Sequence, residues 1–327
     1  MKNLFAMLCM LVILACSTVS VAQELTYVIV DTGLEIFYDD AREIEQPQVG
    51  ERFYGQDGHY VGTGFSFQDN GDGTVSDLNT GLMWQKSPDF DSRVIYDEAM
   101  AYAENFELAG YDDWRVPTVK QLISIADFNG NIRTRTPYLN TDYFDFEYPP
   151  EGGQHREIDV QFWSSDRYVG RIMRNELGAF GYNFADGHQK GYPAAGGPSG
   201  GFFVRLVRGA ENYGVNDFVD NDNGTVTDQA SGLTWQQVDD GNVRNWEDAL
   251  SYAEGLSLAG HDDWRLPNIK ELQSIVDYTR APDARDGAPV GPAIDPALGV
   301  TETESWFWSS TTQLDNTSLG MYICFGQ

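Results

Sequence analysis

The chain has 327 residues, and its 50 acidic and 21 basic residues give a formal net charge of −29. That length suffices for about two domains, and a hydrophobic content of 41% with 34 glycines favours a loop-rich α+β protein over a helix bundle. The charge argues against nucleic acid, anionic membrane surfaces and sulfated polysaccharides as partners, because binding phosphate or sulfate needs a basic surface.

Residues 1–22 have the pattern of a signal peptide. Lys2 supplies the positive n-region, Leu4 to Ala15 the apolar segment, and Ser20-Val21-Ala22 a small-residue cleavage site. The apolar segment is too short to span a bilayer, and no other transmembrane segment is apparent. We therefore expect an exported protein. The alternative is a lipoprotein anchored at Cys16, since the segment ending there resembles a lipoprotein box.

Cysteine usage excludes several classes of site. Cys9 and Cys16 lie in the leader, so Cys324 would be alone in the mature chain. The sequence therefore offers no disulfide framework, no CxxC pair and no cysteine zinc site.

Residues 23–62 form an N-terminal extension without a counterpart elsewhere in the chain. Thr26 to Val30 reads as a short β-strand, and Pro47 and several glycines interrupt the rest. We expect the aromatic and polar segment Tyr54 to Tyr60 to pack on the domain that follows it.

An internal duplication begins after the extension. Four motifs recur in the same order at offsets near 150 residues. They are DNGDGTVSD at 69–77 with DNDNGTVTD at 220–228, TGLMWQ at 80–85 with SGLTWQ at 231–236, LAGYDDWRVPTVKQLISIAD at 108–127 with LAGHDDWRLPNIKELQSIVD at 258–277, and WSS at 163–165 with WSS at 308–310. With only two long units, the pattern predicts tandem domains over 63–209 and 217–327, joined by a linker at 210–216.

The longest motif predicts a loop followed by a helix. Pro117 can stand just before a helix, Thr118 is a plausible N-cap, and Asn268 takes the same place in the second copy. We expect the helix to run to about Asp127. In the preceding loop, we expect a buried Trp114 and an Arg115 that pairs with Asp112 or Asp113.

The recurring tryptophans and arginines are assigned to the structural framework of the two domains. They are Trp84, Trp114, Arg115, Trp163, Trp235, Trp264, Arg265 and Trp308.

The aspartate-rich segments leave two interpretations open. Asp220, Asp222 and Asp228 alternate as calcium ligands do, but Ser231 stands where an EF-hand needs a bidentate glutamate. The segments are β-turns built on Asn-Gly and Asp-Gly chemistry, or looser oxygen-ligand calcium sites with Asp222 and Asp228 as the candidate ligands. Calcium is the only cofactor for which the sequence gives a reason.

A long excursion at 128–161 carries the candidate ligand-binding residues. Long loops in compact domains are usually functional or disordered, and exposed rings can stack on sugars. The candidates are Tyr143, Phe146, Tyr148 and Arg156. The alternative is that the rings pack onto their own domain.

The two copies differ in how they end. The first runs from Trp163 to an evident strand at Gly201–Arg208, whereas the second stops at Gln327, soon after Trp308. We expect that the given chain is truncated at its C-terminus, or that the second domain has an open sheet edge.

The motifs NGDGTVSD, TGLMWQ, AGYDDWRVPTVKQL and FWSS resemble the C-terminal domain family of the Lcl collagen-like adhesin, whose members include many secreted bacterial proteins. The resemblance implies an α+β, C-type-lectin-like fold for each copy, with two helices and a small, mostly antiparallel, twisted sheet. It also implies carbohydrate binding. The same superfold includes formylglycine-generating enzymes, whose RLPT segment looks like Arg265-Leu266-Pro267-Asn268, but a lone Cys324 cannot supply their cysteine pair.

We therefore expect a secreted or surface-associated, non-catalytic binding module for a glycan or cell-surface polymer. A structural envelope protein is the alternative, and an enzyme is the less favoured one. The four histidines lack metal-site spacing, and no repeated histidine accompanies the repeated serines as a base.

Overall fold

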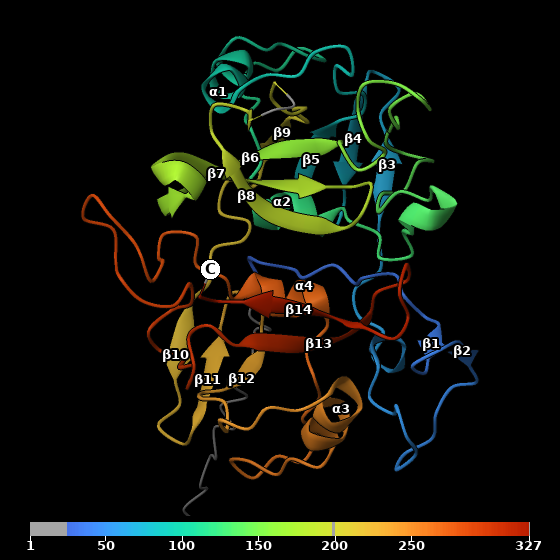
Figure 1. Cartoon of the computed structure of the whole chain (residues 1–327), viewed down its shortest axis with the longest axis vertical. Coiled ribbons are helices and arrows are strands. Elements are labelled where there is room, and N and C mark those ends of the chain that lie inside the picture. The colour runs from blue at the N-terminus through green and yellow to red at the C-terminus, as the bar shows by residue number, and fades with distance from the viewer. Residues whose placement is uncertain (1–24, 198–199, 327) are drawn as a thin grey trace, which may run out of the picture.

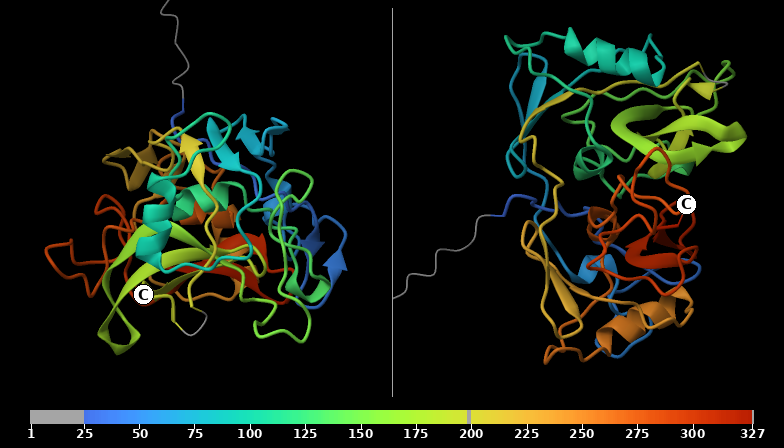
Figure 2. Two further views of the ribbon diagram at one scale, coloured as in Figure 1. Left: turned by 90° about the horizontal axis from the view of Figure 1, so that it is seen from above. Right: turned by 90° about the vertical axis from the view of Figure 1, so that its left-hand side faces the viewer.

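The computed structural model describes residues 25–197 and 200–326, so the predicted leader lies outside the described residues. In this part the chain is α+β, with four short α-helices and five small antiparallel sheets. Figure 1 shows the two sequence repeats one above the other, and Figure 2 shows α1 and α3 at opposite ends of the molecule. Among these residues, none of the helices is long and apolar enough to cross a membrane.

The first repeat contains two sheets and two helices. Its sheets have the orders β3-β4-β5-β9 and β6-β7-β8. The elements are β3 (Phe67–Asp69), β4 (Thr74–Asp77), β5 (Leu82–Gln85), α1 (Tyr96–Glu104), α2 (Val119–Ser124), η2 (Ile132–Thr134), β6 (Gln161–Ile172), η3 (Met173–Asn175), β7 (Glu176–Asn183), β8 (His188–Pro193) and β9 (Val207–Gly209).

The second repeat has the same order of elements with fewer strands. Its sheets have the orders β10-β11-β12 and β13-β14. The elements are β10 (Phe218–Asp220), β11 (Thr225–Asp228), β12 (Thr234–Gln236), α3 (Trp246–Glu254), α4 (Ile269–Ser274), β13 (Trp306–Thr312) and β14 (Gly320–Cys324). Equivalent strands pair in the same register, since Trp84 faces Val75 and Trp235 faces Val226.

The predicted helix starts are confirmed. The Thr118 side chain accepts a hydrogen bond from the Gln121 amide at 3.2 Å, and Asn268 accepts one from Glu271 at 2.9 Å. Each helix is shorter than expected. α2 ends at Ser124, because the Asp127 amide turns to the Tyr138 carbonyl and leaves the helical ladder.

The aromatic segment of the N-terminal extension packs on the second repeat, so the prediction that it lies on the first was wrong. Its elements are β1 (Phe37–Tyr38), β2 (Glu43–Ile44) and η1 (Asp57–His59). The Tyr60 hydroxyl donates to Glu254 at 2.5 Å, Arg52 pairs with Glu247, and Phe53 packs on Trp246. In Figure 1 the blue extension lies beside the orange and red elements of the second repeat.

This contact goes with a difference in residue type between the copies at one strand position. In the first repeat β6 extends to Ile172, and its Arg167 pairs with Asp97 at the start of α1. In the second repeat Thr312 of β13 stands at the position of Arg167, so this strand offers no arginine to the start of α3. Glu247 of α3 is equivalent to Asp97, and it pairs with Arg52 of the extension.

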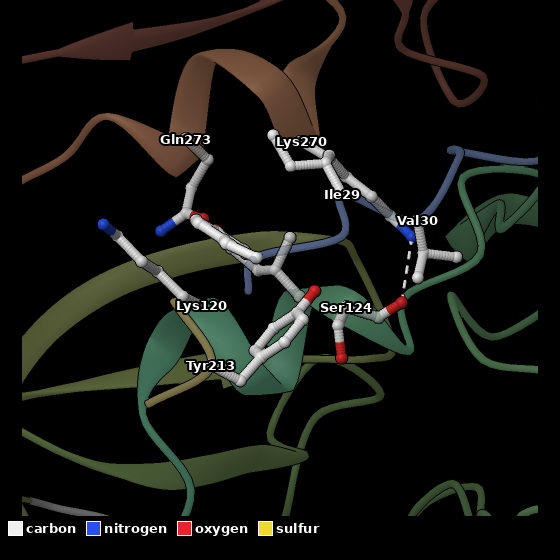
Figure 3. A pocket seen from close by; sticks show the side chains of 9 residues that line it. Ile29, Val30, Lys120, Ser124, Tyr213, Lys270 and Gln273 are labelled. Atoms are coloured by element: carbon white, nitrogen blue, oxygen red, sulfur yellow. Dashed lines mark hydrogen bonds between the residues drawn. The ribbon is translucent and has the colours of Figure 1, made fainter. Parts of the chain in front are cut away.

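The two repeats meet through α2 and α4 and share one hydrophobic core, which includes Leu122 and Ile125 of the first and Ile269 of the second. A cavity of about 10 Å³ lies at this contact, large enough for roughly one water molecule. Figure 3 shows Lys120 and Lys270, which are equivalent in the repeat, beside it. Because the core is shared, the domain boundaries 63–209 and 217–327 stay predictions.

Candidate binding surface

The predicted ring residues of the first repeat are half-buried. Tyr143 packs against Phe67 with ring centroids 5.5 Å apart, and Phe146 meets Tyr148 edge-on at 5.0 Å. Burial raises the pKa of Tyr148 to about 12, and the Arg135 guanidinium lies 4.8 Å from its ring centroid. These rings therefore pack mainly onto their own repeat.

Arg156, the fourth candidate, does not join the rings through its charged group. Its side chain is 73% exposed and pairs with Asp159 at 2.7 Å. The guanidinium keeps the pKa of Asp159 below its usual value, although burial opposes this.

The candidate calcium ligands lie in different environments. Asp222 is exposed in a turn, with a left-handed φ of 56°. Asp228 is fully buried, and its carboxylate accepts hydrogen bonds from the amides of Asp217 and Ala230 and from the side chains of Asn216 and Ser231. Across the described residues, no three His, Cys, Asp or Glu side chains gather as a metal site.

The recurring tryptophans and arginines of the longest motif make the following contacts, and Arg115 has partners other than the expected one. Trp114 is buried, and its indole donates to the Leu108 carbonyl at 3.3 Å, as Trp264 does to Leu258 at 3.2 Å. The expected pairing of Arg115 with a neighbouring aspartate was wrong. Asp113 pairs instead with Arg208, whereas Arg115 donates to the Gly209 and Ala210 carbonyls.

In both copies the Trp-Ser-Ser motif bonds its strand to the segment before the first helix and to the neighbouring strand. The indoles of Trp163 and Trp308 donate to the Val94 and Arg244 carbonyls at 2.8 and 3.0 Å. The hydroxyl of Ser164 donates to the Phe180 carbonyl at 2.9 Å.

The second copy has the equivalent serine bond. Ser309 donates to the Met321 carbonyl at 2.9 Å, and both serines are fully buried. Both hydroxyls donate to carbonyls of the neighbouring strand and are buried, so neither is placed as a nucleophile.

An exposed aromatic cluster lies at the hairpin of β13 and β14. Trp306 is 66% exposed and Tyr322 is 45% exposed. Their rings stack with centroids 4.8 Å apart and an interplanar angle of 11°, and Trp308 meets Tyr322 edge-on at 6.0 Å. Because Trp306 and Trp308 alternate along β13, they share one face of the hairpin.

The same face is covered in the first repeat. Gln161 stands at the position of Trp306, and Gly181 stands at that of Tyr322. A side chain at Gly181 would come within 3.6 Å of Tyr192 on β8, whose ring packs on Phe202 at 4.6 Å. Phe202 in turn lies 4.4 Å from Trp163, which is fully buried.

Sequence reasoning assigned Trp308 to the framework and did not single out Trp306 or Tyr322. The sequence did contain an indication of this cluster. The second copy has Trp306 two residues before Trp308, whereas the first copy has Gln161 two residues before Trp163. Tyr322 could not have been placed without the strand register. The cluster offers two stacked rings with one open face, an arrangement that suits an apolar, flat ligand surface.

Comparisons with known proteins give one match. The family model described as the Lcl C-terminal domain matches residues 73–208 and 224–327. The two matched segments correspond to the two repeats and together cover most of the chain. No curated protein and no solved structure matches.

Proposed function

The chain belongs to the Lcl C-terminal domain family, and from that premise we propose that it is a non-catalytic, adhesin-like module that binds carbohydrate. Family membership supports a surface-associated binding role. It also supports an export route for the chain and a C-type-lectin-like fold for each repeat, both of which belong to this proposal.

The observation that carries the ligand class is the stacked pair Trp306–Tyr322. Large aromatic rings are costly to leave in water, and an exposed cluster of them usually marks a binding site. The C–H face of a pyranose ring is flat and apolar, so it can cover the open face of such a ring, while its hydroxyls stay hydrated. With a net charge of −29, the protein would repel sulfated or uronic glycans, so we propose a neutral saccharide.

A glycan array followed by titration of the best neutral oligosaccharide tests this proposal. Tryptophan fluorescence should change on binding, and Trp306→Ala should weaken the affinity by roughly tenfold or more, since stacking contributes about 1–2 kcal/mol. Tyr102→Ala is the matched control, because Tyr102 is an exposed ring of the first repeat that lies outside the cluster.

Circular dichroism of both variants would establish that they are folded. Failure of every neutral glycan to bind saturably, or binding that Trp306→Ala leaves unchanged, would refute the proposal.

A further inference from the structure

Lys120 of α2 reaches the segment that leads into the second repeat. Its side-chain nitrogen donates to the Asn216 side-chain oxygen at 2.7 Å and to the Gly214 carbonyl at 3.1 Å. Because a C=O bond is about 1.2 Å long, this nitrogen lies within roughly 4 Å of the Asn216 Cγ carbon. Reacting atoms approach to about 3–3.5 Å before a bond forms between them. A small shift of the lysine would therefore bring its nitrogen to a carbon that an amine can attack.

A carboxylate holds the other end of the same amide group. The Asn216 side-chain nitrogen donates to Asp228 Oδ2 at 2.9 Å, and Asp228 is fully buried at the end of β11. Two hydrogen bonds thus connect Lys120, the amide group and the carboxylate in one row. An amide nitrogen must gain a proton before it can leave, and a carboxyl group in contact with that nitrogen is placed to deliver one.

The surroundings of Lys120 favour the reactive form of its amine. Burial lowers the pKa of Lys120 to about 8, although nearby aspartates, Asp228 among them, oppose the shift. The uncharged amine is the nucleophile, and about half of the Lys120 side chains would carry it at pH 8, against less than roughly 1% for an ordinary lysine.

The equivalent lysine of the second repeat provides an internal comparison. Lys270 stands at the position of Lys120, and Phe65 stands at that of Asn216. The Lys270 nitrogen lies 4.5 Å from the Phe65 ring centroid and donates to two backbone carbonyls. A buried lysine is therefore common to both copies, whereas the contact with a side-chain amide is described for Lys120 and not for Lys270.

We propose that Lys120 and Asn216 join spontaneously in an isopeptide bond that ties α2 to the segment before β10. The bond between Lys120 Nζ and Asn216 Cγ forms, and the bond between Cγ and Nδ2 breaks. One proton of the attacking amine passes through the Asp228 carboxyl group to Nδ2, which departs as ammonia. No atom is oxidised or reduced, and no co-reactant is consumed.

Folding assembles this site, since its three groups come from α2, from the segment before β10 and from the end of β11. The cavity of about 10 Å³ beside Lys120 has room for a molecule of the size of water or ammonia. The bond would cross the contact between the two repeats and so keep them together. This inference is independent of the saccharide proposal, because its groups lie outside the Trp306–Tyr322 pair.

Intact-mass spectrometry of the purified chain tests the proposal. Wild type should be lighter than the mass of its mature sequence by about 17 Da, the mass of ammonia. Lys120→Arg keeps a cation at this position but removes the amine, so its mass should show no such loss. Lys190→Arg, at an exposed lysine, is the matched control and should keep the loss.

A tryptic digest locates the bond. Residues 116–133 and 209–244 should appear as one branched peptide, because an acylated Lys120 resists trypsin. In the same digest Lys270 should be cleaved as an ordinary lysine, which gives the free peptide 266–270. Asp228→Asn should reduce the joined fraction by at least roughly tenfold, since it removes the proton carrier. Circular dichroism would establish that the variants are folded.

A folded wild type of unchanged mass would overturn the proposal. A loss of ammonia that persists in Lys120→Arg would also overturn it, because it would assign the loss to cyclisation at another amide. The branched peptide is detected in wild type alone, so the outcome does not depend on the folding of any variant. Saccharide binding is measured separately, and its failure would leave these masses unchanged.

Discussion

The hydroxyl of Thr311 donates a hydrogen bond of 2.6 Å to the buried carboxylate of Asp57, 254 residues away. Thr311 also accepts from the Ile269 amide at the start of α4. In the first repeat Asp166 stands at the position equivalent to Thr311, and its carboxylate accepts directly from the Val119 amide at the start of α2. The second repeat has thus lost a carboxylate from β13, and the N-terminal extension supplies one through a threonine.

Asp57 should make stability depend on pH. Burial raises its pKa to about 7, against hydrogen bonds from Thr311 and Thr32 that lower it. A carboxyl group with a raised pKa in the folded state contributes stability that is fully present below about pH 4. That contribution is lost as the pH rises through about 7. Asp57→Asn should lack this loss. The difference between the unfolding free energies of wild type and the variant should therefore change by roughly 4 kcal/mol between pH 4 and 8.

Urea unfolding at intervals between pH 4 and 8 measures the effect. Asp40→Asn is the control, since Asp40 is exposed and lies outside the cluster. Parallel pH profiles for wild type and Asp57→Asn would contradict the assignment.

Lys270 should give the opposite dependence. It is buried between α4 and the first repeat, where its ammonium donates to the Asp31 carbonyl at 2.9 Å. It also donates to the Ser124 carbonyl at 3.2 Å, as Figure 3 shows. Burial lowers its pKa to about 7, although surrounding aspartates oppose the shift. Between about pH 7 and 10 the folded state loses a proton that the unfolded state keeps, so this residue's contribution to stability rises with pH.

Lys270→Met should abolish that rise. Thermal unfolding at pH 6, 7.5 and 9 would show the stability of wild type increasing relative to the variant. Lys190→Met removes an exposed lysine and should leave the profile of wild type unchanged. A constant difference between wild type and Lys270→Met at all three values would mean that the buried group does not titrate there.

Replacing Arg205 should be among the most destabilising changes in the first repeat. Its guanidinium is fully buried, donates to three carbonyls, and has its pKa lowered to about 9 by burial. Arg205→Met removes the guanidinium that donates to these three carbonyls, and we expect a loss of about 3–5 kcal/mol in urea unfolding. The exposed Arg133→Met should cost less than about 0.5 kcal/mol.

Calcium should not stabilise the aspartate turns. The carboxylate of Asp228 accepts hydrogen bonds from Ala230 and Ser231 of its own turn and from Asn216 and Asp217 before β10, so its oxygens are engaged before any ion arrives. We expect the melting temperature to change by less than about 1 °C on addition of millimolar calcium. Asp228→Ala should cost about 2–4 kcal/mol from lost hydrogen bonds alone. A calcium-dependent rise in melting temperature that Asp222→Asn abolishes would instead favour the calcium interpretation.

Features of short sequence range were predictable. The N-caps Thr118 and Asn268 act within three residues, and the burial of Trp114 and Leu122 follows from patterns within one segment. Long-range partners were not predictable. Arg115 has acidic neighbours in sequence, yet Asp113 pairs with Arg208, which lies 93 residues after Arg115. Arg115 donates instead to a backbone carbonyl.

By itself the sequence determined the duplication, the α+β class and the framework of each repeat, because these depend on local periodicity, capping and turn chemistry that act within a few residues. Tertiary structure decided which surfaces stay open. The extension supplies Arg52 to the start of α3 where the first repeat uses Arg167 of β6, and Trp306 and Tyr322 are exposed where the first repeat has Tyr192 and Phe202. Burial depends on which distant segments arrive at a position, and the free energy that selects among them is a sum over contacts that no local pattern contains.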